Sequence, residues 1–264
     1  MKSLEDLLHA AHNAAQAAAE IHRRRAHTLG PSAWTEKGRA DWVSEVDHAA
    51  ERVAVAEIRE TFPDHAVAAE EGDWGGPAPE DSEVTWYIDP LDGTTNYLHG
   101  YPYHSVAIAA IDREGLAASV VINSGRWETF EAMRGDGARM DGHPITVSKI
   151  DDMELALIGT GFPFKKEELL DEYLSQFRAI LPKTSGVRRT GSAAIDLCDL
   201  ACGRLDGFWE LHLAPWDVAA GVLILREAGG IITDLSGDED VVKHGAFVAG
   251  NPSIYQQLFK LLNP

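Results

Sequence analysis

The most constraining feature of this 264-residue chain is the segment Trp86–Tyr97, which reads W-Y-I-D-P-L-D-G-T-T-N-Y. Its first residues are aromatic and β-branched, which is typical of a buried strand. Pro90 has no N–H to give to a sheet, so we expect the strand to end at Asp89. Two carboxylates, Asp89 and Asp92, then lie three residues apart across a turn. Such a pair repels unless a proton or a cation compensates it.

This segment suits a divalent cation and a phosphate group. Carboxylate and carbonyl oxygens are the ligands that Mg²⁺ prefers, so Asp89 and Asp92 predict a metal site. Gly93 permits close approach of the backbone, and Thr94 suits the start of a helix, where free N–H groups bind anions. A metal site beside an anion site indicates a phosphate ester as ligand. For the Asp-Pro-x-Asp-Gly residues taken alone, a plain turn is the alternative interpretation.

Composition limits the class of protein. With 45% hydrophobic and 25% charged residues, the chain has a globular composition and enough length for a large core. Acidic residues outnumber basic ones by 42 to 23, which argues against nucleic acid or an anionic membrane as a partner. No apolar run approaches the roughly 20 residues that span a bilayer. Cys198 and Cys202 lie four residues apart on a predicted helix, where core packing fits better than a disulfide. We therefore expect a cytoplasmic protein.

Hydrophobic periodicity predicts two different halves in one compact unit. Helices are expected over 3–25 and 45–62, separated by a loop over 28–41. Strands are then expected over 67–70, 84–89, 103–111, 116–122 and 127–133. Further along, strands over 155–160, 187–190, 207–211, 230–234 and 246–249 alternate with helices over 167–181, 192–202, 216–228 and from 252 onward. This pattern predicts an α+β half over residues 1–146 that carries the metal-binding loops, and an α/β half over 147–264 that completes the site.

Four further acidic positions adjoin the ends of predicted elements. They are Asp47 at the start of the second helix, the Glu70-Glu71 pair after a strand, Glu210 after a later strand and Asp217 at the start of a helix. Ligands gather at strand ends and helix starts in open α/β layers, so these distant positions can converge on one point. Each position also has a simpler interpretation, because Asp is a common helix cap and Glu a common solvated turn residue.

Three ordered segments resemble the signature motifs of the inositol monophosphatase family of Mg²⁺-dependent, lithium-sensitive phosphatases. They are Glu70–Gly72, Trp86–Tyr97 and Trp216–Gly221, and Ser44–Ala50 and Gly191–Ala194 also match in order and spacing. The resemblance extends from about Lys37 to Pro252, with the pattern of the bacterial inositol-1-monophosphatases. It implies an α+β / α/β fold, a five-layer αβαβα sandwich of the inositol monophosphatase/fructose-1,6-bisphosphatase type, in a cytoplasmic homodimer.

The resemblance also implies a role for each matched residue. Glu70, Asp89 and the Leu91 carbonyl would hold one Mg²⁺, while Asp89, Asp92 and Asp217 would hold a second. Glu70 would reach a third cation through water, giving two or three Mg²⁺ in each site. The catalytic residues implied are Asp47, Thr94 and Glu70, of which Asp47 and Thr94 would orient and deprotonate the attacking water. The substrate-binding residues implied are Asp92, Gly93, Thr94, Gly191, Ser192, Ala193, Glu210 and Asp217.

The physical chemistry of the reaction agrees with these roles. Phosphoryl transfer needs mainly positioning and neutralisation of phosphate charge, which cations supply. The carboxylates outnumber what one octahedral Mg²⁺ can use, and no Ser, Cys or His nucleophile is required. His104 and His212 lie in apolar strand-like segments and are expected to be packed core or strand-edge histidines, with a catalytic role as the alternative. The role of Lys37, ten residues before Asp47, stays open.

The expected substrate depends on Glu210 and two arginines. A carboxylate accepts hydrogen bonds from a polyol hydroxyl and disfavours a second phosphate, so Glu210 predicts an inositol-phosphate phosphatase that acts on inositol 1-phosphate or a similar polyol monophosphate. Two interpretations of Arg188 and Arg189 stay open, because they suit either a second phosphate or nucleotide or a surface position at the start of a strand.

The alternatives lie in the same family and outside enzymes. Fructose-1,6-bisphosphatase, histidinol-phosphatase and adenosine 3′,5′-bisphosphate phosphatase are the enzymatic alternatives. A regulatory or interaction protein on an inactive phosphatase scaffold is the non-enzyme alternative, against which stands the presence of every implied carboxylate. We therefore expect a phosphoric monoester hydrolase whose partner is a small-molecule phosphate ester.

Overall fold

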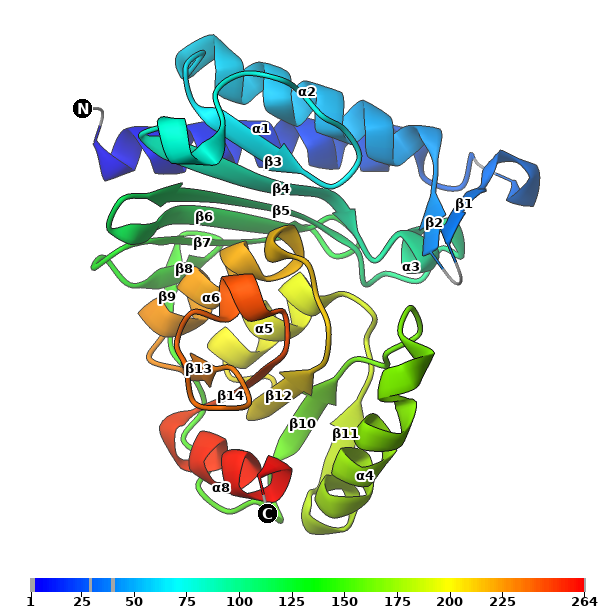
Figure 1. The fold of residues 1–264 in the computed structure, drawn as a ribbon, viewed down its shortest axis with the longest axis vertical. Coiled ribbons are helices and arrows are strands. Elements are labelled where there is room, and N and C mark those ends of the chain that lie inside the picture. The colour runs from blue at the N-terminus through cyan, green and yellow to red at the C-terminus, as the bar shows by residue number, and fades with distance from the viewer. Residues whose placement is uncertain (1–2, 29, 39–40, 264) are drawn as a thin grey trace.

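The computed structural model describes residues 3–28, 30–38 and 41–263, and its elements stack in five layers (Figure 1). Helices α1 (Leu4–Arg25) and α2 (Glu45–Thr61) cover one face of a large sheet. Helices α5 (Ala193–Ala201) and α6 (Pro215–Glu227) separate that sheet from a smaller one. Helices α4 (Leu170–Ile180) and α8 (Pro252–Leu262) form the outer layer. The predicted αβαβα sandwich is therefore confirmed.

The large sheet has the strand order β3-β4-β5-β6-β7-β8-β9. Its strands are β3 (Ala66–Ala69), β4 (Val84–Asp92), β5 (Ser105–Asp112), β6 (Gly115–Asn123), β7 (Glu128–Met133), β8 (Ala138–Met140) and β9 (His143–Ile145). β3 and β4 are parallel, and the later neighbours are antiparallel. Buried alanines of α1, among them Ala11, Ala15 and Ala18, let that helix pack closely against β5 and β6.

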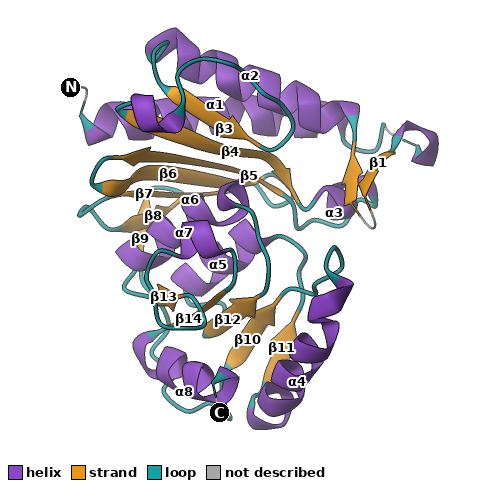
Figure 2. Cartoon of the chain, viewed as in Figure 1, coloured by secondary structure: helices purple, strands orange, loops and turns teal. Residues whose placement is uncertain are grey.

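The smaller sheet has the strand order β11-β10-β12-β14-β13. Its strands are β10 (Leu157–Thr160), β11 (Gly186–Arg188), β12 (Gly207–Glu210), β13 (Ile231–Thr233) and β14 (Phe247–Gly250). β10 is parallel to both β11 and β12, so the carboxyl ends of these three strands share one edge. Figure 2 shows α5 and α6 between the two sheets. α6 is buried on all sides from Val218 to Leu225, as a central helix must be.

The prediction that the strand ends at Asp89 is wrong. β4 continues through Pro90 to Asp92, and its register with β5 shifts between Asp89 and Asp92. An irregular stretch of this kind leaves ladder positions unpaired, so the missing N–H of Pro90 costs no sheet hydrogen bond. The shift also turns Asp89 and Asp92 away from the regular alternation of a strand.

Several short elements were not expected from the sequence. The hairpin of β1 (Thr35–Gly38) and β2 (Asp41–Val43) replaces part of the predicted loop over 28–41, of which residues 29, 39 and 40 lie outside the described residues. Short helices α3 (Thr94–Leu98) and α7 (Val241–His244) and strands β8 and β9 were also not predicted. Single 3₁₀ turns lie at Pro31–Ala33, Pro79–Asp81, Glu167–Leu169 and Leu181–Lys183. Within the described segments, no helix has the length and apolarity that crossing a bilayer requires.

Candidate active site

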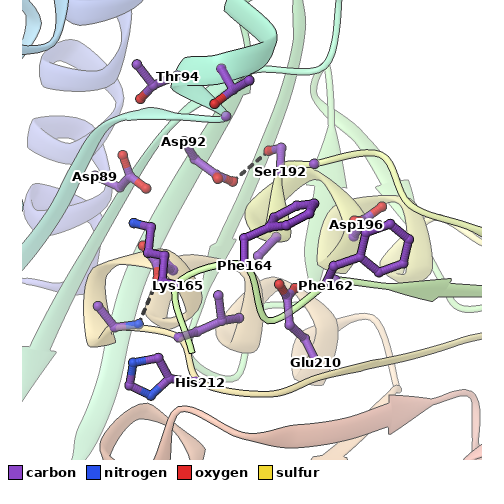
Figure 3. A pocket seen from close by; sticks show the side chains of 18 of the residues that line it. Asp89, Asp92, Thr94, Phe162, Phe164, Lys165, Ser192, Asp196, Glu210 and His212 are labelled. Atoms are coloured by element: carbon purple, nitrogen blue, oxygen red, sulfur yellow. Dashed lines mark hydrogen bonds between the residues drawn. The ribbon is translucent and has the colours of Figure 1, made fainter. Parts of the chain in front are cut away.

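A cavity of about 590 Å³ opens where the end of β4 faces the carboxyl edge of the smaller sheet. Figure 3 shows Asp89 and Asp92 on one side of it and Glu210 and Asp196 on another. The cavity brings together residues that the sequence separates by more than a hundred positions. Its walls include the predicted Glu70, Asp89, Leu91, Asp92, Gly93, Thr94, Gly191, Ser192, Ala193, Glu210 and Asp217. Of the predicted site residues, Asp47 lies behind this wall.

The acidic wall of the cavity consists of Glu70, Asp89, Asp92 and Asp217, with Asp89 and Asp92 at its centre. Asp89 is 2% exposed, and its pKa is raised well above the usual range by burial and by the charges of Glu70, Asp92 and Asp217. Oδ2 of Asp92 accepts hydrogen bonds from Ser192 Oγ at 2.6 Å and from Ala194 N at 2.9 Å. Burial raises the pKa of Asp92 to about 6, although these two hydrogen bonds oppose the rise. Asp92 therefore joins the end of β4 to the start of α5.

Asp217 combines a structural and an electrostatic role. Its Oδ2 accepts the Ala214 N–H at 2.7 Å, which caps α6. Burial, followed by the charges of Asp92 and Glu70, raises the pKa of Asp217 to about 7. The helix cap that the sequence suggested thus also lies in the acidic wall.

The turn after β3 places Glu70 beside a lysine. Oε2 of Glu51 accepts the backbone N–H of Glu71 at 2.8 Å, and this bond holds the turn against α2. Nζ of Lys37 lies 3.1 Å from Glu70 Oε1 and 2.7 Å from Glu71 Oε1. Burial lowers the pKa of Lys37, but the two glutamates outweigh that effect and raise it. Lys37, whose role the sequence left open, is therefore an ammonium group beside the acidic wall.

Asp47 is connected to the cavity through Thr94. Its Oδ2 accepts hydrogen bonds from Ser44 N at 2.8 Å and Ser44 Oγ at 2.7 Å, closing a capping box at the start of α2. Its Oδ1 accepts the hydroxyl of Thr94 at 2.9 Å. That hydroxyl also lies 3.0 Å from the Leu91 carbonyl oxygen. Burial raises the pKa of Asp47, and its hydrogen bonds to Ser44 and Thr94 oppose the rise.

Gly93 has a conformation that requires glycine. Its φ of +86° is in the left-handed region, and a Cβ there would lie 2.8 Å from the Tyr103 carbonyl oxygen. Asn96 reinforces the turn because its Nδ2 donates to the carbonyls of Tyr103 at 2.6 Å and Thr190 at 2.9 Å. This turn fixes the backbone of Gly93 and Thr94, and both residues line the cavity.

Glu210 lies across the cavity from the acidic wall, at the end of β12. A side chain at residue 161 would overlap the Glu210 carboxylate, so Gly161 makes room for it. Burial raises the pKa of Glu210 to about 8, against the lowering effect of Arg189 and with a further rise from Asp92 and Asp217. Glu210 is therefore a hydrogen-bonding group on the wall opposite the predicted cation ligands.

Sequence reasoning missed the loop that follows β10. The guanidinium of Arg189 lies 5.5 Å and 4.9 Å from the ring centroids of Phe162 and Phe164, in cation–π contact with both. Lys165 extends its ammonium toward the acidic wall (Figure 3) and lowers the pKa of Asp217 against the stronger effect of burial. The Phe-Pro-Phe-Lys-Lys run between a predicted strand and helix was the available signal, because exposed aromatic and basic residues in a loop indicate binding.

Asp196 is a second cavity residue that was missed. It is 2% exposed and accepts the Thr190 hydroxyl at 2.8 Å. An acid in the otherwise apolar helix A-A-I-D-L-C-D-L-A was the signal for it. The two histidines also differ from expectation, because His104 precedes β5 and His212 follows β12, outside both strands. His212 is exposed at the cavity wall, so the prediction of a packed histidine is wrong there.

The two arginines differ in position. Arg189 lines the main cavity and also a second cavity of about 330 Å³, whereas Arg188 lines only the second, together with Arg126 and Arg204. Nη1 of Arg188 donates to the Val187 carbonyl at 3.1 Å. Of the two, Arg189 is the one placed to contact a ligand of the main cavity.

The acidic wall fits a divalent cation by its chemistry. Its donors are carboxylate and carbonyl oxygens, and the charge of Glu70 contributes to the raised pKa values of Asp89, Asp92 and Asp217, with a further contribution of Asp92 to the other two. A cation relieves that repulsion. Among the described residues, no three Asp, Glu, His or Cys side chains already gather tightly enough to define an assembled cation site. The fit therefore rests on the donor set and on the mutual repulsion of its members.

In excess chelator, we expect the free energy of unfolding to fall as the pH rises from about 6.5 to 8, a range above the ordinary histidine pKa, where the lowered pKa values of His22 and His104 no longer oppose the change. The carboxyl groups of Asp92, Asp217 and Glu210 have pKa values of about 6, 7 and 8, above the roughly 4 of an unfolded chain. The folded state thus binds more protons, and the stability that this provides is lost as the pH passes each folded pKa. Urea unfolding at about pH 6.5, 7, 7.5 and 8 measures the effect. Excess Mg²⁺ should reduce the loss, and stability that rises through this range in chelator would contradict the assignment.

Comparison with known proteins agrees with this geometry. The family model described as "Inositol monophosphatase family" matches residues 3–263. The Nus factor SuhB of Pseudomonas aeruginosa is 41% identical over 263 residues, covering 99% of this chain and 97% of that protein. The extragenic suppressor protein SuhB from Bartonella henselae superimposes with a TM-score of 0.90 at 37% identity, covering 97% of this chain and 98% of the other. An inositol monophosphatase from Anabaena gives 0.87 at 36% identity, with 98% and 96% covered. This chain belongs to the inositol monophosphatase family.

Proposed function

We propose that the protein is a Mg²⁺-dependent phosphoric monoester hydrolase acting on inositol 1-phosphate or a similar polyol monophosphate. The observation that carries the proposal is the division of one cavity into two walls. The acidic wall around Asp89 and Asp92 suits cations and the phosphate they attract, whereas Glu210 suits hydroxyl groups on the far side. Family membership supports phosphatase chemistry, and the walls support the choice of substrate.

The acidic wall supplies ligands for the cations. Glu70, Asp89 and the Leu91 carbonyl would hold one Mg²⁺, and Asp89, Asp92 and Asp217 a second, with a third reached by Glu70 through water. Bound there, the cations neutralise phosphate charge and lower the pKa of water. The open backbone of Gly93 and Thr94 is placed to donate N–H groups to the phosphate.

In this proposal, Asp47 and Thr94 handle the proton of the attacking water. Thr94 lines the cavity, and its single hydroxyl hydrogen is donated to Asp47, which lies behind the wall, or to the Leu91 carbonyl. The lone pairs of the Thr94 oxygen are therefore left to accept a hydrogen bond from water. As the water loses its proton to Thr94, the Thr94 proton can pass to the buried carboxylate of Asp47, whose pKa is raised.

The wall opposite the acidic residues favours a neutral alcohol over a second phosphate. A second phosphate near Glu210 would lie beside two carboxyl groups, those of Glu210 and Asp196, which line the same wall. Burial is the main cause of the raised pKa of Glu210, and cations at the acidic wall would offset the smaller contributions of Asp92 and Asp217 and so favour the ionised form of Glu210. An ionised carboxylate is a strong acceptor for polyol hydroxyls.

A bisphosphate substrate is the competing proposal within the same chemistry. Arg189 is the specific observation in its favour, since its guanidinium lies in the main cavity beside Phe162 and Phe164. Sugar bisphosphates and adenosine 3′,5′-bisphosphate therefore belong in any substrate panel, together with histidinol phosphate. We place inositol 1-phosphate first because Glu210 and Asp196 put two carboxyl groups into the cavity beside Arg189.

The variant Glu210→Gln is expected to lower kcat/KM for inositol 1-phosphate about 5- to 100-fold. It keeps the shape of the side chain but removes a charge-assisted hydrogen bond worth roughly 1–3 kcal/mol. Turnover of p-nitrophenyl phosphate, which has no polyol hydroxyls, should change little. Steady-state kinetics on both esters and on fructose 1,6-bisphosphate provide the measurement.

Two arginine variants complete that test. Arg188→Ala is the matched control because Arg188 lies outside the main cavity, and it should leave both activities unchanged. Arg189→Ala should affect both esters to a similar extent through the loop it contacts. A selective loss of bisphosphate hydrolysis in Arg189→Ala, with full inositol 1-phosphate turnover in Glu210→Gln, would favour the bisphosphate proposal.

A regulatory role is a second candidate function. Its specific support is that several relatives, including that of Pseudomonas aeruginosa, carry the name Nus factor. We propose such a role as an addition to hydrolysis, because Glu70, Asp89, Asp92 and Asp217 are all present and all line the cavity. Failure of every phosphate ester in the panel would leave the regulatory role as the main proposal.

A further inference from the structure

A chain of hydrogen bonds through two histidines lies behind the loop that carries Asp89 and Asp92. His22, near the end of α1, is 1% exposed, and its Nε2 lies 2.9 Å from the Pro90 carbonyl oxygen. Its Nδ1 lies 2.8 Å from Ser124 Oγ. Nδ1 of His104 lies 2.8 Å from the same Ser124 oxygen. The cavity walls do not include these three side chains, so the network supports the loop from its far side.

The positions of the protons in this network follow from its chemistry. A carbonyl oxygen only accepts, so Nε2 of His22 carries a hydrogen and donates it to Pro90. Burial, followed by the charge of His104, lowers the pKa of His22 to about 3, so the ring is neutral and its Nδ1 accepts. Ser124 therefore donates to His22 and accepts from Nδ1–H of His104. Each of the three hydrogen bonds then has one donor and one acceptor: His104 donates to Ser124, Ser124 donates to His22, and His22 donates to the Pro90 carbonyl.

Tyr97 holds the first histidine from another side. Its hydroxyl donates to the backbone carbonyl of His22 at 2.9 Å, and its ring lies 5.6 Å from the His22 ring and 5.1 Å from the His104 ring. The backbone N–H of Ser124 donates to the His104 carbonyl at 3.1 Å. The end of α1, helix α3 and the segments beside β5 and β6 are thus tied together at one point.

Pro90 lies where the sheet gives the least support. The register of β4 with β5 runs regularly to Asp89, paired with Ala107, and resumes at Asp92, paired with Ser105. Between these pairs the loop must direct successive carbonyls to different sides. The Leu91 carbonyl lies beside the Thr94 hydroxyl, and Leu91 lines the cavity, while the Pro90 carbonyl is bound to His22. Without the bond to His22, the Pro90–Leu91 peptide would keep the hydrogen bond from Leu91 N to Asp89 Oδ1 at 3.0 Å but would lose the support of its carbonyl.

We propose that His22 is a positioning residue for the cation site, acting by holding the Pro90 carbonyl away from the cavity so that the Leu91 carbonyl faces it. The inference rests on the cation site of the proposed function. It makes a specific claim about one nitrogen, because only Nε2 contacts the loop. Groups that orient the ligands of a metal typically change its affinity 10- to 100-fold when they are removed.

Two variants of His22 separate its two nitrogens. In His22→Asn the side-chain amide can replace only the ring edge that faces Ser124, which leaves the Pro90 carbonyl without its donor. In His22→Gln the longer side chain can place an N–H where Nε2 lies, which keeps that donor. We expect Mg²⁺ affinity to fall roughly 10- to 100-fold in His22→Asn and to stay near the wild-type value in His22→Gln.

The control variant is His65→Asn, at the opposite end of β4. Nδ1 of His65 accepts a hydrogen bond from Trp86 Nε1 at 3.1 Å, which an asparagine oxygen can replace, and the His65 ring stacks on Phe62 at 4.5 Å, which asparagine cannot do. It should lower the melting temperature without changing Mg²⁺ affinity. Calorimetric titration with Mg²⁺ and the Mg²⁺-dependent rise in melting temperature are both measured with no substrate present.

The outcomes separate this inference from the proposed function. Wild-type protein that gives no response to Mg²⁺ would overturn the proposed cation site, and the inference with it. If wild-type protein responds to Mg²⁺ and His22→Asn binds Mg²⁺ as tightly as wild type does, the inference alone is overturned. Equal weakening of Mg²⁺ binding in His22→Asn and His22→Gln overturns it as well. If His22→Asn fails to fold, Ser124→Ala in a His22→Gln background tests the same claim, because it removes the network while keeping the donor to Pro90 and should retain Mg²⁺ affinity.

Discussion

Excess chelator is expected to reduce phosphate release from inositol 1-phosphate to the background rate, and added Mg²⁺ is expected to restore it. Asp89, Asp92 and Asp217 repel one another, and a phosphate dianion brought to the same wall would add to that repulsion. Without cations the cavity therefore rejects its own substrate. The measurement is inorganic phosphate released over time, first in chelator and then during titration with Mg²⁺.

Two controls give that experiment a single interpretation. Circular dichroism in chelator must show that the protein is still folded, since loss of the fold would also stop turnover. The same titration with p-nitrophenyl phosphate should show the same dependence on Mg²⁺, because this ester shares the phosphate and lacks the polyol. Full turnover of either ester in excess chelator would rule out the proposed role of the acidic wall.

The sequence predicted the acidic wall well because most of it is locally encoded. Asp89, Asp92, Gly93 and Thr94 lie within six residues, so their proximity depends on one turn and hardly on the rest of the fold. Asp217 was recognisable for a similar reason, because a helix start has a strong local signal. The error at Pro90 is the exception. Whether a strand ends at proline depends on the pairing that the neighbouring strand offers, and β5 tolerates an irregular stretch there.

The rest of the cavity depends on contacts that no local pattern contains. Arg189 becomes a cavity residue because the loop after β10 brings Phe162 and Phe164 onto its guanidinium. Lys37 is fixed by two glutamates more than thirty positions away in the chain. The His22 network joins residues 68 and 102 positions apart. Periodicity and turn chemistry describe neighbours in sequence, so they give no information on such pairs.

The variants Asp92→Asn and Asp47→Asn are expected to separate cation binding from proton transfer. Asp92→Asn removes a charge from the acidic wall, so Mg²⁺ affinity and turnover should fall together. Asp47→Asn leaves the wall intact, so Mg²⁺ affinity should remain close to wild type. Its turnover at saturating Mg²⁺ should nevertheless fall by about 10²- to 10⁴-fold, the usual contribution of a positioned base. Calorimetry without substrate gives the affinity, and kinetics at saturating Mg²⁺ give kcat.

The control for Asp47 must account for its capping role, since Oδ2 also accepts two hydrogen bonds from Ser44. Ser44→Ala removes the cap hydroxyl, at a typical cost of about 1 kcal/mol in stability, and leaves the contact between Asp47 and Thr94 in place. If Asp47 acts through Thr94, Ser44→Ala loses stability but keeps most of kcat, while Asp47→Asn loses kcat out of proportion to stability. Equal loss of kcat in Ser44→Ala and Asp47→Asn would mean that Asp47 acts only as a helix cap. Equal loss of Mg²⁺ affinity in Asp47→Asn and Asp92→Asn would place Asp47 among the cation ligands. We expect the first pattern, because the hydroxyl of Thr94 lies 2.9 Å from Asp47 Oδ1 and can pass its one hydrogen to that carboxylate.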